Sequence, residues 1–119
     1  MTRPTERVLQ SACRSVIARR RIVDLVRKTE VLPSRVTMTR GTEIHYKTEN
    51  FQLTGSFKLR GASAKLSSLP VDRPVITASS GNHGIACSLA AQKTGHKLTV
   101  VLPENVIDQK RNSIEAFGT

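Results

Sequence analysis

Aromatic side chains are scarce in this sequence, which has no tryptophan, one tyrosine and three phenylalanines among 119 residues. A hydrophobic core therefore has to be built from Val, Ile, Leu and Ala. The basic N-terminal segment has no aromatic residue among its arginines, so it lacks the stacking surface on which proteins bind single-stranded nucleic acid. This scarcity argues against nucleic acid as a partner.

Long apolar runs and cysteine clusters are also missing. No apolar run approaches the length of about 18 residues that a membrane-spanning helix needs, so we expect no membrane partner. The two cysteines, Cys13 and Cys87, are too far apart in the sequence to indicate a disulfide framework or a zinc-ligand cluster. The simplest interpretation is a reducing, cytoplasmic setting, with no metal site in this chain.

Acidic residues are outnumbered, because 9 Asp and Glu face 19 Lys and Arg, which gives a net charge of +10. Residues 1–60 hold 13 basic and 5 acidic side chains, a balance of 13 − 5 = +8. The excess is concentrated in Arg14, Arg19, Arg20, Arg21, Arg27 and Lys28. A solvated helix face is the interpretation we favour. A surface that binds phosphates without sequence preference and an organellar targeting helix are the alternatives.

Apolar spacing predicts alternating helices and strands. One or two helices are expected over residues 6–28, where a broken apolar stripe would lie on a larger body. Further helices are expected over residues 57–67, from 85 to a left-handed cap at Gly95, and over 107–118. Strands are expected over residues 43–47, 75–78 and 98–102. The order strand, helix, strand, helix in the second half predicts a right-handed parallel α/β unit.

Finer expectations concern burial and capping. The strand over residues 43–47 should be half-buried, with the side chains of Ile44 and Tyr46 on its buried face. The continuous apolar run 98–102 is typical of a strand that is buried on both faces. The segment 54–56 should supply N-cap oxygens to the helix that follows it. His45 and His96 are expected at the surface, and Cys87 in a small apolar slot.

The first segment with chemical potential is Thr54-Gly55-Ser56-Phe57-Lys58-Leu59-Arg60-Gly61. Lys58 falls in the first turn of a predicted helix, where the positive end of the helix dipole disfavours an ammonium group. The neighbouring cation Arg60 should act in the same direction. A free amine is what attack on a carbonyl requires, so Lys58 is a candidate for Schiff-base chemistry. Position alone makes this a weak signal.

The second segment is Ser79-Ser80-Gly81-Asn82-His83-Gly84, between a predicted strand and a predicted helix. Glycines let the backbone approach a ligand, and N–H groups at a helix start suit an anion. The segment matches neither the Walker loop nor the Gly-x-Gly-x-x-Gly fingerprint. A carboxylate or phosphate site and an ordinary tight turn both remain open on these local grounds.

Together the two segments are far more specific. The run from Lys47 to Ala62, followed by the run from Thr77 to Gly84, closely resembles the threonine/serine dehydratase and serine racemase family. These are pyridoxal-phosphate enzymes with the tryptophan-synthase-like α/β fold, known as fold type II. The resemblance spans about residues 22–118 and includes Val101-Leu102-Pro103. It implies an incomplete fold of parallel strands flanked by helices.

The resemblance also implies a division of the chain into two domains and a role for each candidate site residue. Residues 1–70 would hold N-terminal helices, a strand and the lysine segment of the large domain, and residues 71–119 would begin the small α/β domain. Lys58 would be the Schiff-base lysine and Phe57 would pack against the ring of pyridoxal 5'-phosphate. Asn82 would hydrogen-bond the cofactor's phenolic oxygen. The substrate carboxylate would bind the loop Ser79, Ser80, Gly81, Asn82 and His83.

Ser80 bears on which reaction is implied. Racemases of this family carry a serine here as an acid/base on the opposite face, whereas many of its threonine dehydratases carry alanine. Some eliminating relatives also keep a hydroxyl. We expect β-elimination from serine or threonine, giving a 2-oxo acid and ammonia, with racemisation as the alternative.

Several expected family features are not found before Thr119. Complete relatives have two domains and on the order of 200–400 residues. Their glycine-rich phosphate loop, their residue facing the pyridine nitrogen and any divalent-metal site lie downstream. We therefore expect a fragment that folds poorly alone and forms a homo-oligomer when full length. Leu59 and His83 count against membership of the cysteine- or threonine-synthase branch of the same fold. A second alternative is a non-catalytic fragment that binds a partner through its basic N-terminus.

Overall fold

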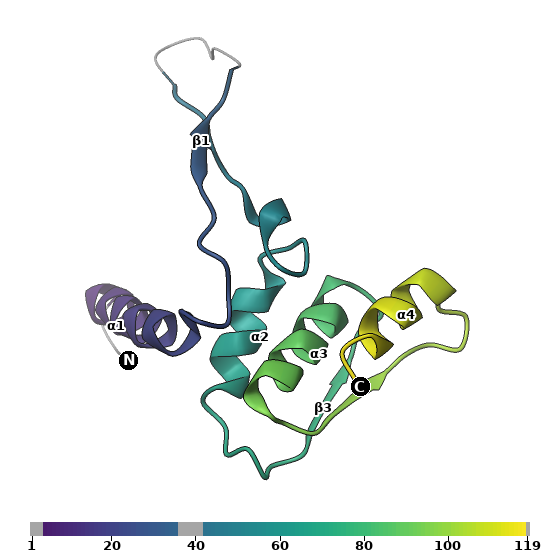
Figure 1. Cartoon of the computed structure of the whole chain (residues 1–119). Coiled ribbons are helices and arrows are strands. Elements are labelled where there is room, and N and C mark those ends of the chain that lie inside the picture. The colour runs from purple at the N-terminus through teal and green to yellow at the C-terminus, as the bar shows by residue number, and fades with distance from the viewer. Residues whose placement is uncertain (1–3, 36–41, 119) are drawn as a thin grey trace.

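The computed structural model describes residues 4–35 and 42–118 (Figure 1). The helices are α1 (Pro4–Ile22), the 3-10 helix η2 (Glu49–Phe51), α2 (Lys58–Leu66), α3 (Asn82–Thr94) and α4 (Asp108–Glu115). The strands are β1 (Val31–Pro33), β2 (His45–Lys47), β3 (Val75–Ala78) and β4 (Leu98–Val101). Every expected helix and strand is present, although several bounds differ.

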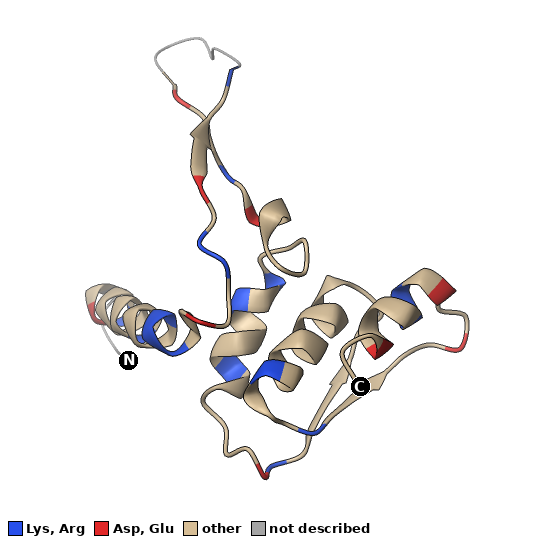
Figure 2. Cartoon of the chain, in the orientation of Figure 1, with Lys and Arg blue, Asp and Glu red and all other residues tan. Residues whose placement is uncertain are grey.

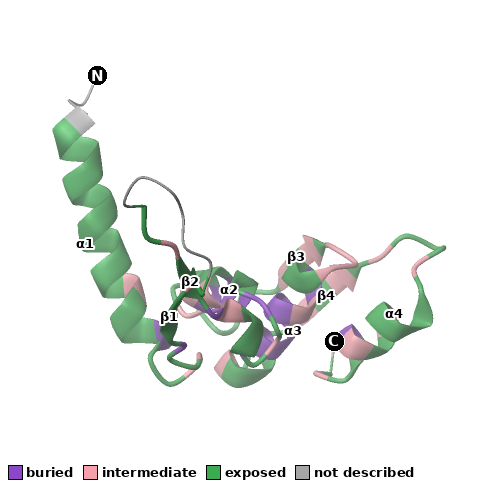
Figure 3. Ribbon diagram, turned by 90° about the horizontal axis from the view of Figure 1, so that it is seen from above, coloured by how far each residue is buried: buried purple, intermediate pink, exposed green. Residues whose placement is uncertain are grey.

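The core is the contact between α2 and α3, which lie side by side in the middle of the molecule (Figures 1 and 3). Its buried residues are Leu59, Ala62 and Leu66 of α2 with Ala86, Cys87, Leu89, Ala90 and Ala91 of α3. Alanines dominate the α3 side, so the two helix backbones can approach closely. Cys87 is 7% exposed, which confirms its expected place in an apolar slot.

The second half forms the expected parallel unit. β3 and β4 pair in parallel, from Val75 opposite Leu98 to Ala78 opposite Val101, and α3 connects them. Gly95 ends α3 with a φ of 75°, and its N–H donates to the Ala91 carbonyl, as expected for a left-handed cap.

Two burial expectations in this half are wrong. β4 is not buried on both faces: Val101 is 50% exposed, and Ile76 of the neighbouring strand is 70% exposed. The reason is that α3 covers one face of the two-stranded sheet and no described element covers the other. His96 is 7% exposed rather than at the surface, because the elements around the end of α3 cover it, and its Nδ1 lies 2.8 Å from the Thr94 hydroxyl.

The first half includes an exposed antiparallel ribbon of β1 and β2. It projects away from the helices (Figure 1). The sequence did not indicate β1, because three residues that end at Pro33 are too few to show an alternating pattern. Tyr46 was expected to be half-buried but is 54% exposed, since no described element covers the ribbon. Ile44 is partly buried and His45 exposed, as expected.

α1 ends at Ile22, earlier than the expected residue 28. The chain turns there because the backbone of Arg27 is held elsewhere: its N–H donates to Gln52 Oε1 at 2.7 Å, and its carbonyl accepts from Gln52 Nε2 at 2.9 Å. The apolar stripe expected over residues 6–28 lies on the body only at its end, where Ile22 is buried and Val26 packs against the core. The larger apolar residues earlier in α1 are exposed, contrary to expectation. None of the helices described here is long and apolar enough to span a membrane.

Candidate active site

Lys58 is the first residue of α2 and its side chain is exposed. Its Nζ lies 4.9 Å from the centre of the Phe57 ring, which is within range for a cation–π contact. Phe57 is 59% exposed. An amine and an aromatic face are therefore presented together at the start of this helix.

The turn before Lys58 does not cap α2 as expected. Phe57 occupies the N-cap position and no side chain bonds the free N–H groups there. Gly55 takes a left-handed φ of 69°, which directs the chain into the helix. The Thr54 and Ser56 hydroxyls are instead buried without a hydrogen-bond partner among the described residues. Two polar atoms next to Lys58 are thus left for another group to satisfy.

Arg60, two residues after Lys58, is held by Glu49 of η2. Arg60 Nε and Nη2 donate to the two carboxylate oxygens of Glu49 at 2.9 and 2.7 Å (Figure 2 shows the charges in this region). The bonds from Arg60 lower the pKa of Glu49 to about 2, with a further contribution from the Thr29 hydroxyl. The charge of Arg60 is consequently balanced by a carboxylate, so it does not act on Lys58 as a free cation.

A second set of bonds fixes the same region from the N-terminal side. Gln52 is 4% exposed and binds both backbone groups of Arg27. The Arg27 carbonyl also accepts from Arg60 Nη2 at 3.1 Å, so Gln52 and Arg60 hold one point of the chain. Glu49 and Gln52 therefore have a structural role, because they fix the segment that leads into α2.

The loop after β3 is anchored at both ends. The Ser79 N–H donates to the Val101 carbonyl at 3.3 Å, and its Oγ accepts from the Gly81 N–H at 3.3 Å. A Cβ at Gly84 would overlap the Ser79 carbonyl oxygen and approach Ile114 Cδ1 to 3.2 Å. Only glycine fits at position 84, so this turn requires the close backbone approach that the sequence suggested.

The residues of the loop differ in exposure. Ser79, Ser80 and Gly81 are partly exposed, whereas Asn82 and His83 are exposed at the start of α3. α2 and α3 begin at the same end of the packed pair (Figure 1), so Lys58 and this loop lie at the same end of that pair. The structure thus brings the two segments singled out in the sequence to neighbouring helix starts. Both starts offer backbone N–H groups to an anion.

A groove of about 220 Å³ opens beside this pair, between α2, β3 and α3. It is lined by Ala62 and Lys65 of α2, Thr77 of β3, and His83 and Cys87 of α3, among others. Of the predicted site residues only His83 lines it. His83 Nε2 lies 3.5 Å from Cys87 Sγ, and burial raises the pKa of that thiol. Lys65, Thr77 and Cys87 were not among the sequence candidates, because nothing in the local sequence distinguishes them from core and surface positions.

Comparisons with known proteins identify the family. Residues 22–119 match the family described as pyridoxal-phosphate dependent enzymes. The chain belongs to this family. It is 42% identical over 105 residues to serine racemase from Dictyostelium discoideum and 43% identical to a putative threonine dehydratase from Sinorhizobium fredii. Each match covers 85% of this chain and 32% of the relative, so the chain spans about a third of their length.

The fold expectation is confirmed by a solved structure. The crystal structure of the Dictyostelium discoideum serine racemase matches with a TM-score of 0.83 and 40% identity, over 89% of this chain and 36% of that one. The family is pyridoxal-phosphate dependent, as the resemblance implied. The residues described above fit this cofactor, because an exposed amine, an exposed aromatic ring and two buried hydroxyls without partners lie together at residues 54–58.

Proposed function

We propose that this chain supplies the lysine-bearing part of a pyridoxal-phosphate enzyme acting on a small amino acid of the serine or threonine type. The observation that carries the proposal is the position of Lys58, exposed at the first residue of α2 and at the same end of the helix pair as the glycine-bearing turn 79–84. In this proposal β-elimination to a 2-oxo acid and ammonia is the main reaction. Amino-acid racemisation is the alternative.

When bound, the cofactor supplies an electron sink for negative charge that develops at the substrate Cα. Lys58 is assigned as the attachment point for its aldehyde and as the base that accepts the Cα proton once the substrate has displaced it. Phe57, beside the Lys58 amine, is assigned to pack against the ring. Asn82 is assigned to donate a hydrogen bond to the ring oxygen from the start of α3.

The loop between β3 and α3 is assigned to the substrate carboxylate. Its residues Ser79, Ser80, Gly81, Asn82 and His83 lie at a helix start, where N–H groups and the helix dipole favour an anion. Gly84 supports this assignment, because it keeps the turn tight against the carbonyl of Ser79. His83 is assigned to orient the turn rather than to transfer a proton, since its ring contacts the Cys87 thiol.

Ser80 determines whether two-faced proton transfer is available. A hydroxyl on the face opposite Lys58 can return a proton to Cα, which inverts the substrate, whereas loss of the β-hydroxyl after proton removal by Lys58 gives elimination. The relatives include both reaction types at nearly equal identity, so similarity does not separate them. We place elimination first and assign Ser80 as the residue on which racemisation depends.

The proposal also covers the domain boundaries, the oligomeric state and the location of the complete protein in the cell. Residues 1–70 are assigned to the large domain and residues 71–119 to the start of the small one. The complete protein is proposed to be a homo-oligomer. It is assigned to the cytoplasm, where both free cysteines, Cys13 and Cys87, would stay reduced.

The test is a hybrid in which residues 22–119 replace the matching third of the Dictyostelium serine racemase. We expect the hybrid to be yellow, to release 2-oxo acid from serine or threonine, and to carry a borohydride-trapped label on Lys58. Lys58→Ala should abolish the colour and the product. Lys93→Ala, a control at an exposed lysine in the last turn of α3, should keep both. A label that maps to another lysine would refute the assignment.

A second variant separates the two reactions. Ser80→Ala should leave 2-oxo acid release within a few-fold and abolish interconversion of D- and L-serine. If Ser80→Ala removes elimination and racemisation equally, Ser80 is not a specific acid/base and the turn simply needs its hydroxyl. If elimination is absent from the unsubstituted hybrid while racemisation is present, racemisation becomes the main activity.

A further inference from the structure

The guanidinium group of Arg60 holds three segments of the chain together. Its Nε and Nη2 donate to the two carboxylate oxygens of Glu49 in η2 at 2.9 and 2.7 Å. Nη2 also donates to the Arg27 carbonyl at 3.1 Å and to the Thr29 hydroxyl at 3.3 Å, both in the segment that follows α1. These four residues form a junction in which one planar group fixes the start of α2 to residues 27–29 and to η2.

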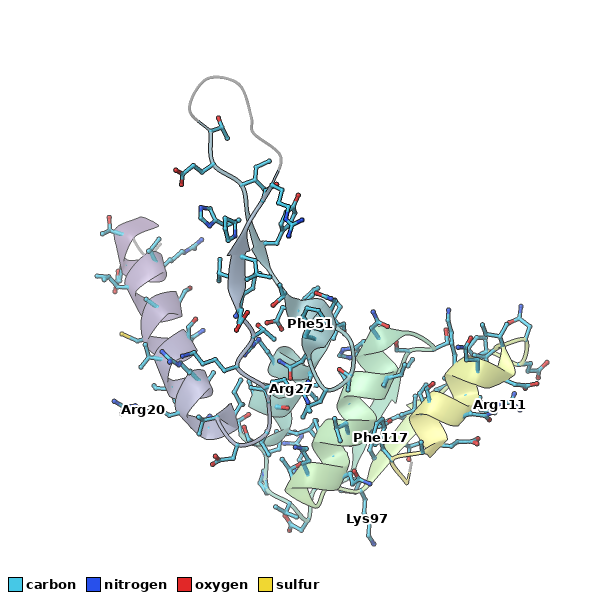
Figure 4. The ribbon with its side chains drawn as sticks, turned by 45° about the horizontal axis from the view of Figure 1, so that its top comes forward. Arg20, Arg27, Phe51, Lys97, Arg111 and Phe117 are labelled. Atoms are coloured by element: carbon cyan, nitrogen blue, oxygen red, sulfur yellow. The ribbon has the colours of Figure 1, made fainter. Side chains whose placement is uncertain are left out.

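Further bonds join the partners of Arg60 to one another. The Thr29 hydroxyl donates to Glu49 Oε1, and Arg27 Nη1 donates to the Phe51 carbonyl at 3.2 Å. Arg27 and Phe51 accordingly lie next to each other (Figure 4). The Glu49 and Arg60 side chains are 15% and 33% exposed, so solvent screens their attraction less than it screens that of a surface pair. The junction is therefore a connected polar network whose members restrain each other.

The first turn of α2 depends on this junction because the helix has no side-chain cap. Phe57 occupies the N-cap position, and its side chain makes no cap hydrogen bond. A helix start without a capping side chain keeps unsatisfied N–H groups and is less stable than a capped one. Arg60 is the third residue of the helix, and its N–H donates to the Phe57 carbonyl at 3.0 Å. Its side chain thus anchors the turn in which a capping side chain is missing.

Lys58 and Arg60 project from this turn in opposite directions. Successive residues of a helix are about 100° apart, so two positions along the helix correspond to about 200°. Arg60 is directed into the junction, whereas Lys58 is exposed and its Nζ lies 4.9 Å from the centre of the Phe57 ring. Because Glu49 balances the charge of Arg60, the influence of Arg60 on Lys58 passes through the backbone that they share.

We infer that Arg60 is a positioning residue for Lys58. Its bonds within the junction fix the backbone from which the Lys58 amine projects beside the Phe57 ring. The inference rests on the proposed function, in which Lys58 holds the cofactor, and it gives Arg60 no contact with cofactor or substrate. Lysine cannot replace Arg60, because an ammonium group is a point charge and does not reproduce two parallel N–H bonds from a planar fork.

The position of the Lys58 side chain can be measured in the 119-residue chain without cofactor. In a chain with ¹³C-labelled lysine, the Phe57 ring should move the ε-CH₂ protons of Lys58 upfield of those of the other lysines, because they lie over its face. Lys58→Arg assigns the signal by removing it, and Phe57→Leu should abolish its shift. Arg60→Gln should lose most of the shift, since the turn is no longer anchored.

Two further variants identify which property of Arg60 matters. Arg60→Lys keeps the positive charge but loses the fork, so it should lose most of the shift as well. Glu49→Gln keeps Arg60 and its bonds to the other segment, so it should lose a smaller part. It also supplies the answer if the Arg60 variants fail to fold. A full shift in Arg60→Lys, or in Glu49→Gln as the only folded variant, would overturn the inference.

A matched control separates positioning from general stability. Ile114→Val shortens a side chain that is 2% exposed on α4, so it should destabilise the chain without touching the junction. Both variants are compared under conditions where urea unfolding shows the chain to be fully folded. Ile114→Val should keep the Lys58 shift. An equal loss in Ile114→Val and Arg60→Gln would mean that Arg60 only stabilises the fold, and the inference would be wrong.

The hybrid enzyme described above gives a second readout. Arg60→Gln should lower kcat on the order of 100-fold with little change in KM, because the amine is displaced while the carboxylate-binding turn is intact. A raised KM with an unchanged kcat would contradict a positioning role. If borohydride labels another lysine in the unsubstituted hybrid, the proposed function is wrong, whereas the ring-current shift still decides whether Arg60 positions Lys58.

Discussion

Helix α1 and the α2–α3 pair have opposite surroundings within one chain. α1 is rich in arginine, and apart from Ile22 at its end its larger apolar side chains are exposed by half or more. The pair buries leucines and alanines against each other, with Leu59, Ala86 and Ala90 fully covered. Both regions are helices with apolar residues at helical spacing, so amphipathic spacing by itself does not say whether a helix face is buried.

The largest expected effect on stability tests the difference between α1 and the α2–α3 pair directly. Leu59→Ala should destabilise the α2–α3 pair by about 4 kcal/mol, because it leaves a cavity in a fully buried position. Leu9→Ala, the same change on α1, should cost less than about 0.5 kcal/mol. Hydrogen exchange of the α2 and α3 amides should therefore accelerate on the order of 1000-fold in the first variant and hardly at all in the second. Similar effects would mean that α1 is packed as tightly as α2.

Two glycines of the central helices provide the next contrast. Gly84→Ala should destabilise the chain by about 3 kcal/mol, since its Cβ has no space beside the Ser79 carbonyl. Gly61→Ala, on α2, has no atom within 4 Å of its added Cβ and should stabilise the helix by about 0.5–1 kcal/mol. Urea unfolding followed by circular dichroism measures both. A neutral Gly84→Ala would show that the turn can move away without cost.

The reactivities of the two cysteines allow α1 and α3 to be compared without any substitution. Cys13 is exposed on α1, whereas Cys87 is buried on α3 with a raised pKa, so less of it is thiolate at neutral pH. A thiol reagent should modify Cys13 on the order of 100-fold faster than Cys87. Peptide mapping after timed labelling measures the ratio. Equal rates would indicate that α3 opens readily in the isolated chain.

The ion pair between Glu49 and Arg60 lies near the point where the segment after α1 meets α2. Its removal should destabilise the chain less than the Leu59→Ala and Gly84→Ala substitutions. Glu49→Gln should cost about 2 kcal/mol, because the side chains of the pair are only 15% and 33% exposed. Glu43→Gln is the control, since Glu43 is 86% exposed beside His45 and should contribute almost nothing.

The ion pair also predicts a pH dependence. The folded chain lowers the pKa of Glu49 from 4.5 to about 2, so its contribution is complete above pH 4.5 and is lost as the pH falls through 2. Unfolding at several pH values should show stability decreasing over this window, and a smaller decrease in Glu49→Gln. An identical pH profile in both chains would contradict the assignment of the lowered pKa to this carboxyl group.

Most of the candidate site could be predicted from the sequence, because its features depend on residues that are close together in the chain. Lys58 at a helix start, the tight turn ending at Gly84, and the cap at Gly95 all depend on residues within a few positions of each other. Helical and strand periods predicted the existence and type of most elements for the same reason. The assigned catalytic roles of Lys58 and Ser80 stay predictions, because they depend on groups beyond these local patterns.

Local patterns determined the family relationship, the parallel β3–α3–β4 unit and the position of the candidate lysine. Only the tertiary structure decided where α1 ends, how Arg60 is paired and which faces are covered. Gln52 holds Arg27 across 25 positions and Glu49 holds Arg60 across 11, and neither spacing is visible as a period in the sequence. The burial of His96 and the open face of Ile76 follow from which neighbours fold against them, because burial is a property of the packed arrangement rather than of any single segment.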